Sequence, residues 1–153
     1  MAAKNTDELK NTLKDVHMKD VPAFFRENRE SLLTEEKPFA AYMRRLIRQK
    51  GLKQRNVFIM ADVSEGHAYK LLSQEKHTKQ RDVILRICYA AEFTLEETQK
   101  ALRIYGMPEL YPKYPRDAAL MICFNERPGS VIDVNEFLET HGFEVLRPCG
   151  ALD

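Results

Sequence analysis

Apolar residues recur along most of this chain at intervals of three and four residues, the spacing that places them on one face of an α-helix. The clearest stripe precedes Gly51 and consists of Phe39, Tyr42, Met43, Leu46 and Ile47. The same spacing predicts further helices over residues 54–61, 65–73, 79–91, 95–105, 116–125 and 131–141. A sustained alternation with a period of two, which would indicate strands, is not seen. The pattern therefore predicts an all-α fold.

Residues that favour helix N-caps stand at the starts of the predicted helices: Thr6, Asp20, Ser64, Thr78, Thr94 and Ser130. The first two would open short helices near the amino terminus. Glu97 follows Thr94 by three residues, which predicts a capping box, and Ser130 and Asp133 open the last predicted helix. These local signals fix where most helices are expected to begin.

Proline is concentrated in "MPELYPKYP", residues 107–115, which we expect to be extended. This segment marks the end of a unit of five predicted helices over residues 38–106. We expect an N-terminal helical extension over residues 1–37 and a C-terminal helical extension over residues 107–153. Apolar residues near and beyond the boundary are expected mainly to fill the core of the last two helices: Tyr105, Met107, Leu110, Tyr111, Tyr114 and Phe124.

Composition narrows the classes of protein that fit. Hydrophobic residues make up 44% of the 153 residues, enough for a packed core, and charged residues make up 31%. The longest apolar run, residues 118–124, is far shorter than the roughly 20 residues that a membrane-spanning helix needs. The amino terminus lacks the apolar segment of a secretion signal. We expect a soluble, cytoplasmic protein without a membrane partner.

Residues that carry chemistry are scattered. Cys88 and Cys123 have apolar neighbours and are expected to be buried thiols, whereas Cys149 is expected near the surface; no CxxC motif or disulfide framework is present. The histidines are equally far apart: His17, His67, His77 and His141. Neither a glycine-rich phosphate loop nor a nucleophile motif is found. We expect no enzyme activity, no metal site and no cofactor.

The net charge is only +1, but it is unevenly distributed. Residues 40–86 contain eleven basic and four acidic side chains, a local charge of +7, which leaves −6 for the rest of the chain. A basic surface favours contact with nucleic acid, although basic residues on helices are more often simply solvated.

Within the basic region, "GLKQRNVFIMADVSEGHAYKLLS", residues 51–73, forms two short amphipathic segments joined by a tight turn. It resembles, without gaps, the helix-turn-helix of the lambda-repressor/Cro-like (XRE) family of DNA-binding proteins. The likeness continues through "RDVILRICYAAEFTLEETQ", which is similar to the fourth and fifth helices of the family. Residues 111–146 resemble the C-terminal extension of some bacterial, mostly Firmicute, members. The resemblance implies a five-helix lambda-repressor-like domain over residues 38–106.

The resemblance also implies sequence-specific binding of double-stranded DNA by a homodimeric transcriptional regulator, a repressor or autoregulator. The helix over residues 65–73 would enter the major groove, which is about 12 Å wide. Its outward residues would read bases: Glu65, Gly66, His67, Tyr69, Lys70 and Ser73. Residues around it would contact phosphates: Lys53, Gln54, Arg55, Ser64, Lys76, Lys79 and Arg81.

Three residues of this region are unusual. Phe58 and Asp62 stand where the family has a tiny residue and a turn glycine, and Phe58 needs extra room between the helices, filled from the added segments. Asp62 accepts a left-handed backbone better than most non-glycine residues. Glu65 is acidic; it would either accept from a cytosine amine or act only as a favourable charge at the helix start.

The alternative is a non-enzymatic protein-interaction adaptor that uses the helix-turn-helix fold as a scaffold. Its acidic C-terminal helices would then dock a protein partner. A DNA reader should lose affinity when Lys70 is replaced by Glu, whereas an adaptor should tolerate that change and fail on truncation after Tyr105.

Overall fold

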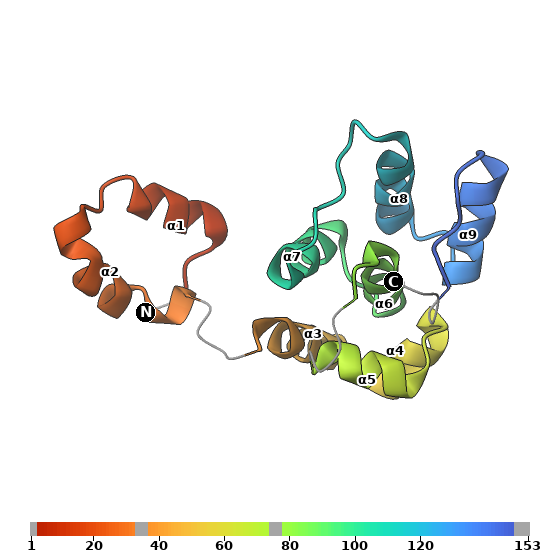
Figure 1. The fold of residues 1–153 in the computed structure, drawn as a ribbon, viewed down its shortest axis with the longest axis horizontal. Coiled ribbons are helices and arrows are strands. Elements are labelled where there is room, and N and C mark those ends of the chain that lie inside the picture. Colours follow the sequence, from red (N-terminus) through yellow and green to blue (C-terminus); the bar gives the residue numbers. More distant parts are fainter. Residues whose placement is uncertain (1–2, 33–36, 74–77, 149–153) are drawn as a thin grey trace. The chain divides into compact units, whose positions relative to one another are not determined.

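The computed structural model describes residues 3–32, 37–73 and 78–148 of the chain (Figure 1). All regular elements within these ranges are helices, so the predicted all-α fold class is confirmed. No helix in the described ranges is long and apolar enough to cross a membrane. The chain divides into two compact units, Met1–Glu36 and Lys37–Asp153. The predictions made for Lys76, His77 and Cys149 fall outside the described residues.

The first unit contains α1 (Thr6–Leu13), α2 (Val21–Glu27) and two short 3-10 helices, Met18–Asp20 and Arg29–Ser31. Asn5, not Thr6, caps α1, so that prediction was wrong. The Asn5 side chain accepts from the Glu8 N–H at 2.9 Å, and Glu8 accepts from the Asn5 N–H at 2.9 Å. A cap at Asn5 places Glu8 at the third helical position, and this pair completes a capping box.

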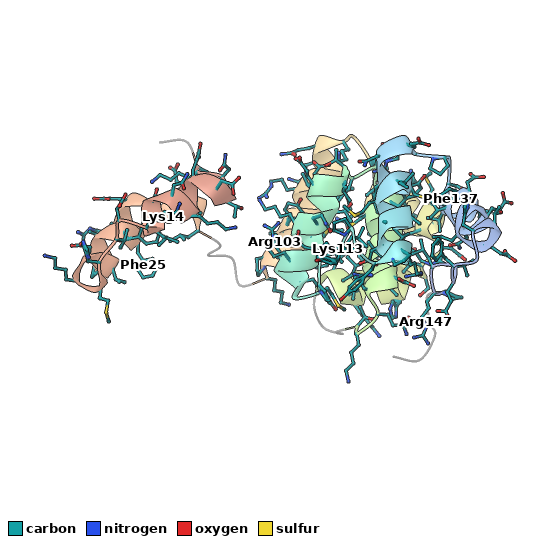
Figure 2. The ribbon with its side chains drawn as sticks, turned by 90° about the horizontal axis from the view of Figure 1, so that it is seen from above. Lys14, Phe25, Arg103, Lys113, Phe137 and Arg147 are labelled. Carbon is teal, nitrogen blue, oxygen red and sulfur yellow. The ribbon has the colours of Figure 1, made fainter. Side chains whose placement is uncertain are left out.

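The first unit buries little apolar surface. Of the apolar face predicted for α2, Phe24 is buried, but Val21 and Phe25 are exposed (Figure 2). Asp20 lies at the N-cap of α2 as predicted, although its side chain makes no capping hydrogen bond. A hydrogen bond from the Lys4 N–H to the Ser31 hydroxyl at 2.6 Å joins the two ends of the described part of this unit.

The second unit is built around one buried helix. Its elements are α3 (Pro38–Gln49), α4 (Gln54–Ala61), α5 (Glu65–Leu72), α6 (Arg81–Ala90), α7 (Leu95–Tyr105), α8 (Pro115–Glu126) and α9 (Val131–Thr140). Figure 1 shows α6 at the centre of this unit with the other helices around it. Every residue of α6 after Asp82 is buried. One continuous core runs from Phe39 to Leu146, so α8 and α9 pack with the five preceding helices.

Several turns follow their sequence signals. Gly51 adopts φ +72°, which lets the Leu52 N–H reach the Ile47 carbonyl at 3.1 Å and ends α3. Gly106 ends α7 in the same left-handed region. The capping box predicted for Thr94 and Glu97 is present. Ser130 lies at the N-cap of α9 as predicted, and its N–H donates to the Asp133 carboxylate at 2.7 Å.

Two predicted caps behave differently. Ser64 occupies the N-cap of α5, but its side chain makes no capping hydrogen bond. Thr78 is not an N-cap, because α6 begins at Arg81 after Gln80. The Thr78 hydroxyl instead accepts from the Gln80 N–H at 3.0 Å, so it stabilises the turn that leads into the helix.

A charged side chain is buried in the middle of α6. Arg86 is 4% exposed and donates to three backbone carbonyls. Its Nη1 reaches the Ala61 carbonyl at 3.2 Å, its Nη2 the Leu146 carbonyl at 2.8 Å, and its Nε the Arg147 carbonyl at 2.7 Å. The guanidinium therefore joins the end of α4 to the C-terminal segment. One of the eleven basic residues between 40 and 86 consequently adds no charge to the surface.

Helices α6 and α8 each carry the dipeptide Arg-Asp in their first turn, and the two dipeptides pair with each other. Arg81 binds Asp117 through two hydrogen bonds of 3.2 and 2.5 Å. Arg116 binds Asp82 through two of 3.2 and 2.9 Å. Each carboxylate also accepts a backbone N–H, one from the α7–α8 connection and one from the C-terminal segment. These pairs hold α8 against the start of α6.

Replacing Asp117 with Asn should test this contact. The Asp117 side chain is 5% exposed, so the change leaves a partly buried guanidinium without its counter-ion. We expect the free energy of unfolding to fall by about 2–3 kcal/mol, measured by urea unfolding followed by circular dichroism. Glu109→Gln is the control, because its pair with Arg103 is 43% and 49% exposed and should contribute less than about 0.5 kcal/mol. Equal effects in the two variants would contradict the role given to Asp117.

Candidate nucleic-acid interface

Helices α4 and α5 are joined by a turn of three residues. Asp62 adopts the left-handed conformation at φ 57° and ψ 47°, as predicted for the position of the missing glycine. The Val63 N–H then reaches the Phe58 carbonyl at 3.0 Å, and the Val63 side chain is buried. The turn is thus fixed by backbone hydrogen bonds and by burial of its central residue.

The inner faces of both helices are packed, as the apolar spacing predicted. Val57, Phe58 and Ala61 of α4 are buried, and the buried residues of α5 are Ala68, Leu71 and Leu72. The Phe58 ring meets the Tyr69 ring edge-on, with centroids 5.2 Å apart. Phe58 is therefore accommodated against α5 itself, where we expected the added segments to fill the space. Tyr69 is 40% exposed and so both packs and faces outward.

The outer face of α5 carries the predicted base-reading residues. Glu65, Gly66, Tyr69 and Lys70 are exposed, and their spacing places them on one side of the helix. His67 and Ser73 are partly exposed. Ser73 lies at the C-cap, where its hydroxyl donates to the Lys70 carbonyl at 3.1 Å. The structure thus brings four of the six residues together on one accessible surface.

The predicted phosphate contacts divide into two groups. Lys53, Arg55, Ser64 and Lys79 are exposed, and Gln54 is partly exposed as the first residue of α4. Arg81 forms the second group, because Asp117 neutralises its charge through a bidentate ion pair. We therefore remove Arg81 from the set of residues available to a phosphate.

The surface charge of residues 40–86 is lower than their sequence suggests. Lys50 binds Glu97 at 2.8 Å, in addition to the internal bonds of Arg81 and Arg86. Burial alone would raise the pKa of the Glu97 carboxyl, but hydrogen bonds from Lys50 and Thr94 outweigh it and hold the pKa below its ordinary value. Three of the eleven basic side chains thus bind partners within the fold.

Two of the three cysteines lie in the core. Cys88 and Cys123 are buried, as predicted, and burial raises the pKa of both thiols. Within the ranges that the structure describes, no three His, Cys, Asp or Glu side chains come close enough to hold a metal ion.

A second surface feature was not predicted. Ile59 and Met60, on the outer side of α4, are 66% and 58% exposed and border an open groove toward the start of α9. One indication of this feature was present in the sequence: Ile59 and Met60 are large apolar residues outside the buried stripe of a short helix. Helix spacing alone could not show that α9 forms the opposite wall.

No protein-family model, curated protein or solved structure matches this chain. Support for a function therefore comes from the surface of α4 and α5 and from the resemblance of residues 51–73 to a helix-turn-helix.

Gly66 provides a test of the described surface. A methyl group in its place would meet no atom within 4 Å, and Gly66 lies within the first turn of α5. We expect Gly66→Ala to raise the free energy of unfolding by about 0.5–1 kcal/mol, measured by urea unfolding. Gly51→Ala should lower it by about 1 kcal/mol or more, because φ at Gly51 is +72°. A loss of stability in Gly66→Ala would contradict an open helical position.

Proposed function

We propose that this protein is a sequence-specific, double-stranded DNA-binding transcriptional regulator that inserts α5 into the major groove. The observation that carries the proposal is the two-sided character of α5. Its inner side is packed through Ala68 and Leu71, while Gly66 and Lys70 lie on an accessible outer side. A recognition helix needs this arrangement, because it must be supported from behind and open in front. The resemblance of residues 51–73 to the lambda-repressor-like helix-turn-helix supports the same assignment.

Each outward residue of α5 has a role that suits its chemistry. Lys70 donates to the guanine acceptors or to a phosphate, and Glu65 accepts from a cytosine amine. Gly66 lets the backbone approach the bases closely. Tyr69 presents its ring to a thymine methyl group, and the contact with Phe58 limits its freedom before binding. The surface thus combines a donor, an acceptor and an apolar contact.

Phosphate contacts come from the residues that flank α5. Lys53 and Gln54 lie at the start of α4, where unpaired backbone amides also favour an anion. Arg55, Ser64 and Lys79 complete the described set, and Lys76 belongs to it from the sequence alone. These contacts orient the protein on the duplex without reading its sequence.

The proposal includes a homodimer that acts as a repressor or autoregulator at its own or a neighbouring promoter. One helix of eight residues contacts only a few base pairs, so two copies on a two-fold operator supply the required specificity.

The adaptor alternative receives less support from the packing. Of the six residues expected mainly to fill the core, Tyr105, Leu110 and Phe124 are buried and Met107 is partly buried against the core, whereas Tyr111 and Tyr114 are exposed, contrary to that expectation. Truncation after Tyr105 would remove α8 and α9 from a continuous core and unfold the unit. Loss of function on truncation therefore does not separate the two hypotheses, and point substitutions must do so.

Charge reversal at Lys70 is the decisive test. We expect the protein to prefer a promoter fragment from its own locus to a scrambled duplex, and to bind more weakly at about 200 mM salt than at about 50 mM. Lys70→Glu should weaken binding to the preferred fragment by about ten- to a hundredfold, measured by fluorescence anisotropy, since a good base contact contributes about 1–3 kcal/mol.

Lys113→Glu is the matched control, because Lys113 is an exposed lysine in the α7–α8 connection. That connection lies at the opposite edge of the unit from α5 (Figure 1), and Lys113 itself is labelled in Figure 2. Lys113→Glu should change the affinity by less than about threefold. Equal losses in the two variants would indicate non-specific charge effects, and an absence of binding to either duplex at low salt would overturn the proposal.

Gly66→Ala adds a second readout. The variant should be more stable than the original protein yet bind the preferred fragment more weakly, because the added methyl group separates the helix from the bases. An unchanged affinity would show that Gly66 does not lie against DNA.

A further inference from the structure

An open groove runs between α4 and the start of α9. It has two adjoining parts, of about 470 and 320 Å³, and Met60 and Val131 line both. The first part continues to Ile132, and the second to Arg127 and Glu92. The combined space falls in the range of small-molecule binding sites.

The sides of the groove are apolar and exposed. Ile132 at the start of α9 is 70% exposed, and it faces the same groove as Ile59 and Met60 of α4, which are 66% and 58% exposed. Exposed apolar patches of this kind are typical of binding surfaces in soluble domains.

Three helices end at this groove, each with an uncommon backbone conformation. Among the described non-glycine residues, positive φ occurs at Asp62, Glu92 and Arg127, and all three line the groove. They follow the ends of α4, α6 and α8. Such residues cluster at functional sites because the surrounding structure must compensate their cost.

Arg127 has hydrogen-bonding capacity that the protein does not use. Its Nη1 donates to the Tyr89 carbonyl at 2.8 Å, and its guanidinium lies over the Tyr89 ring at 4.7 Å. Its Nη2 is buried without a hydrogen-bond partner. Burial lowers the pKa of the guanidinium from its ordinary value. A buried donor without an acceptor is unfavourable, so an acceptor supplied from the groove would relieve it.

We propose that the groove binds a small amphipathic monocarboxylate, with its carboxylate on Arg127 and its apolar body across Met60, Val131 and Ile132. Because Nη2 is buried in the structure, this binding mode requires the Arg127 side chain to turn toward the groove when the ligand binds. The acidic side chains of Asp62 and Glu92 line the same space and disfavour a polyanion such as a nucleotide. A single carboxylate next to an apolar chain gives Nη2 an acceptor and brings less negative charge than a polyanion.

The test compares three probes that share an eight-carbon chain: octanoate, 1-octanol and octylamine. Each is titrated into the full-length protein without DNA, and binding is followed by amide chemical shifts in two-dimensional NMR. Octanoate should saturate, shift amides of residues 59–62, 89–92 and 127–132, and bind about tenfold more tightly than octanol, the contribution of one charge-assisted hydrogen bond. Octylamine should bind no better than octanol.

Variants separate the two halves of the site. Arg127→Gln should lower octanoate affinity about tenfold, to the level of octanol, and leave octanol binding unchanged. Ile132→Ser should weaken both probes severalfold, because it removes apolar contact area. Since Ile132 is 70% exposed, this variant should fold normally even if Arg127→Gln does not. Ile122→Ser, 49% exposed on α8 and outside the groove, should change neither affinity.

Several outcomes would overturn the proposal: no saturable binding of octanoate, equal affinity for octanoate and octanol, tighter binding of octylamine, or shifts that lie away from the groove. Because the titrations contain no DNA, their failure leaves the proposed DNA-binding role untouched.

Discussion

The buried guanidinium of Arg86 fixes the positions of two segments of the second unit that are far apart in sequence. Every residue of helix α6 after Asp82 is buried, and Arg86 is only 4% exposed, so its guanidinium needs acceptors within the fold. It finds them in the carbonyls of Ala61, Leu146 and Arg147, at the end of α4 and in the C-terminal segment. The end of α4 and the C-terminal segment are therefore fixed by the same side chain, and the turn into α5 begins at that point.

The paired Arg-Asp dipeptides add a second long-range connection, between other parts of the chain. They bind the start of α8 to the start of α6 and use charges that would otherwise lie on a basic surface. Within residues 40–86, exposed basic side chains remain on α3, such as Arg44 and Arg48, and around α4 and α5, such as Lys53, Arg55 and Lys70. Internal pairing thus decides which part of the surface stays available to a nucleic acid.

Helix α4 connects the two proposed sites. Its Phe58 packs against Tyr69 of α5, whereas the next two residues, Ile59 and Met60, border the groove toward α9. A molecule in the groove would therefore touch the helix that supports the outward face of α5. Both sites thus share one short helix of eight residues.

The sequence by itself determined the helices, most of their ends and the inward faces of α3 to α7, because apolar spacing, capping boxes and left-handed turns depend on residues within about four positions of each other. It also indicated which residues of α5 face outward. Only the tertiary structure decided that Arg81 is occupied by Asp117, that Arg86 lies in the core, and that α9 forms a groove with α4. These contacts join residues 25 to about 75 positions apart, and helical periodicity carries no information about which helices meet.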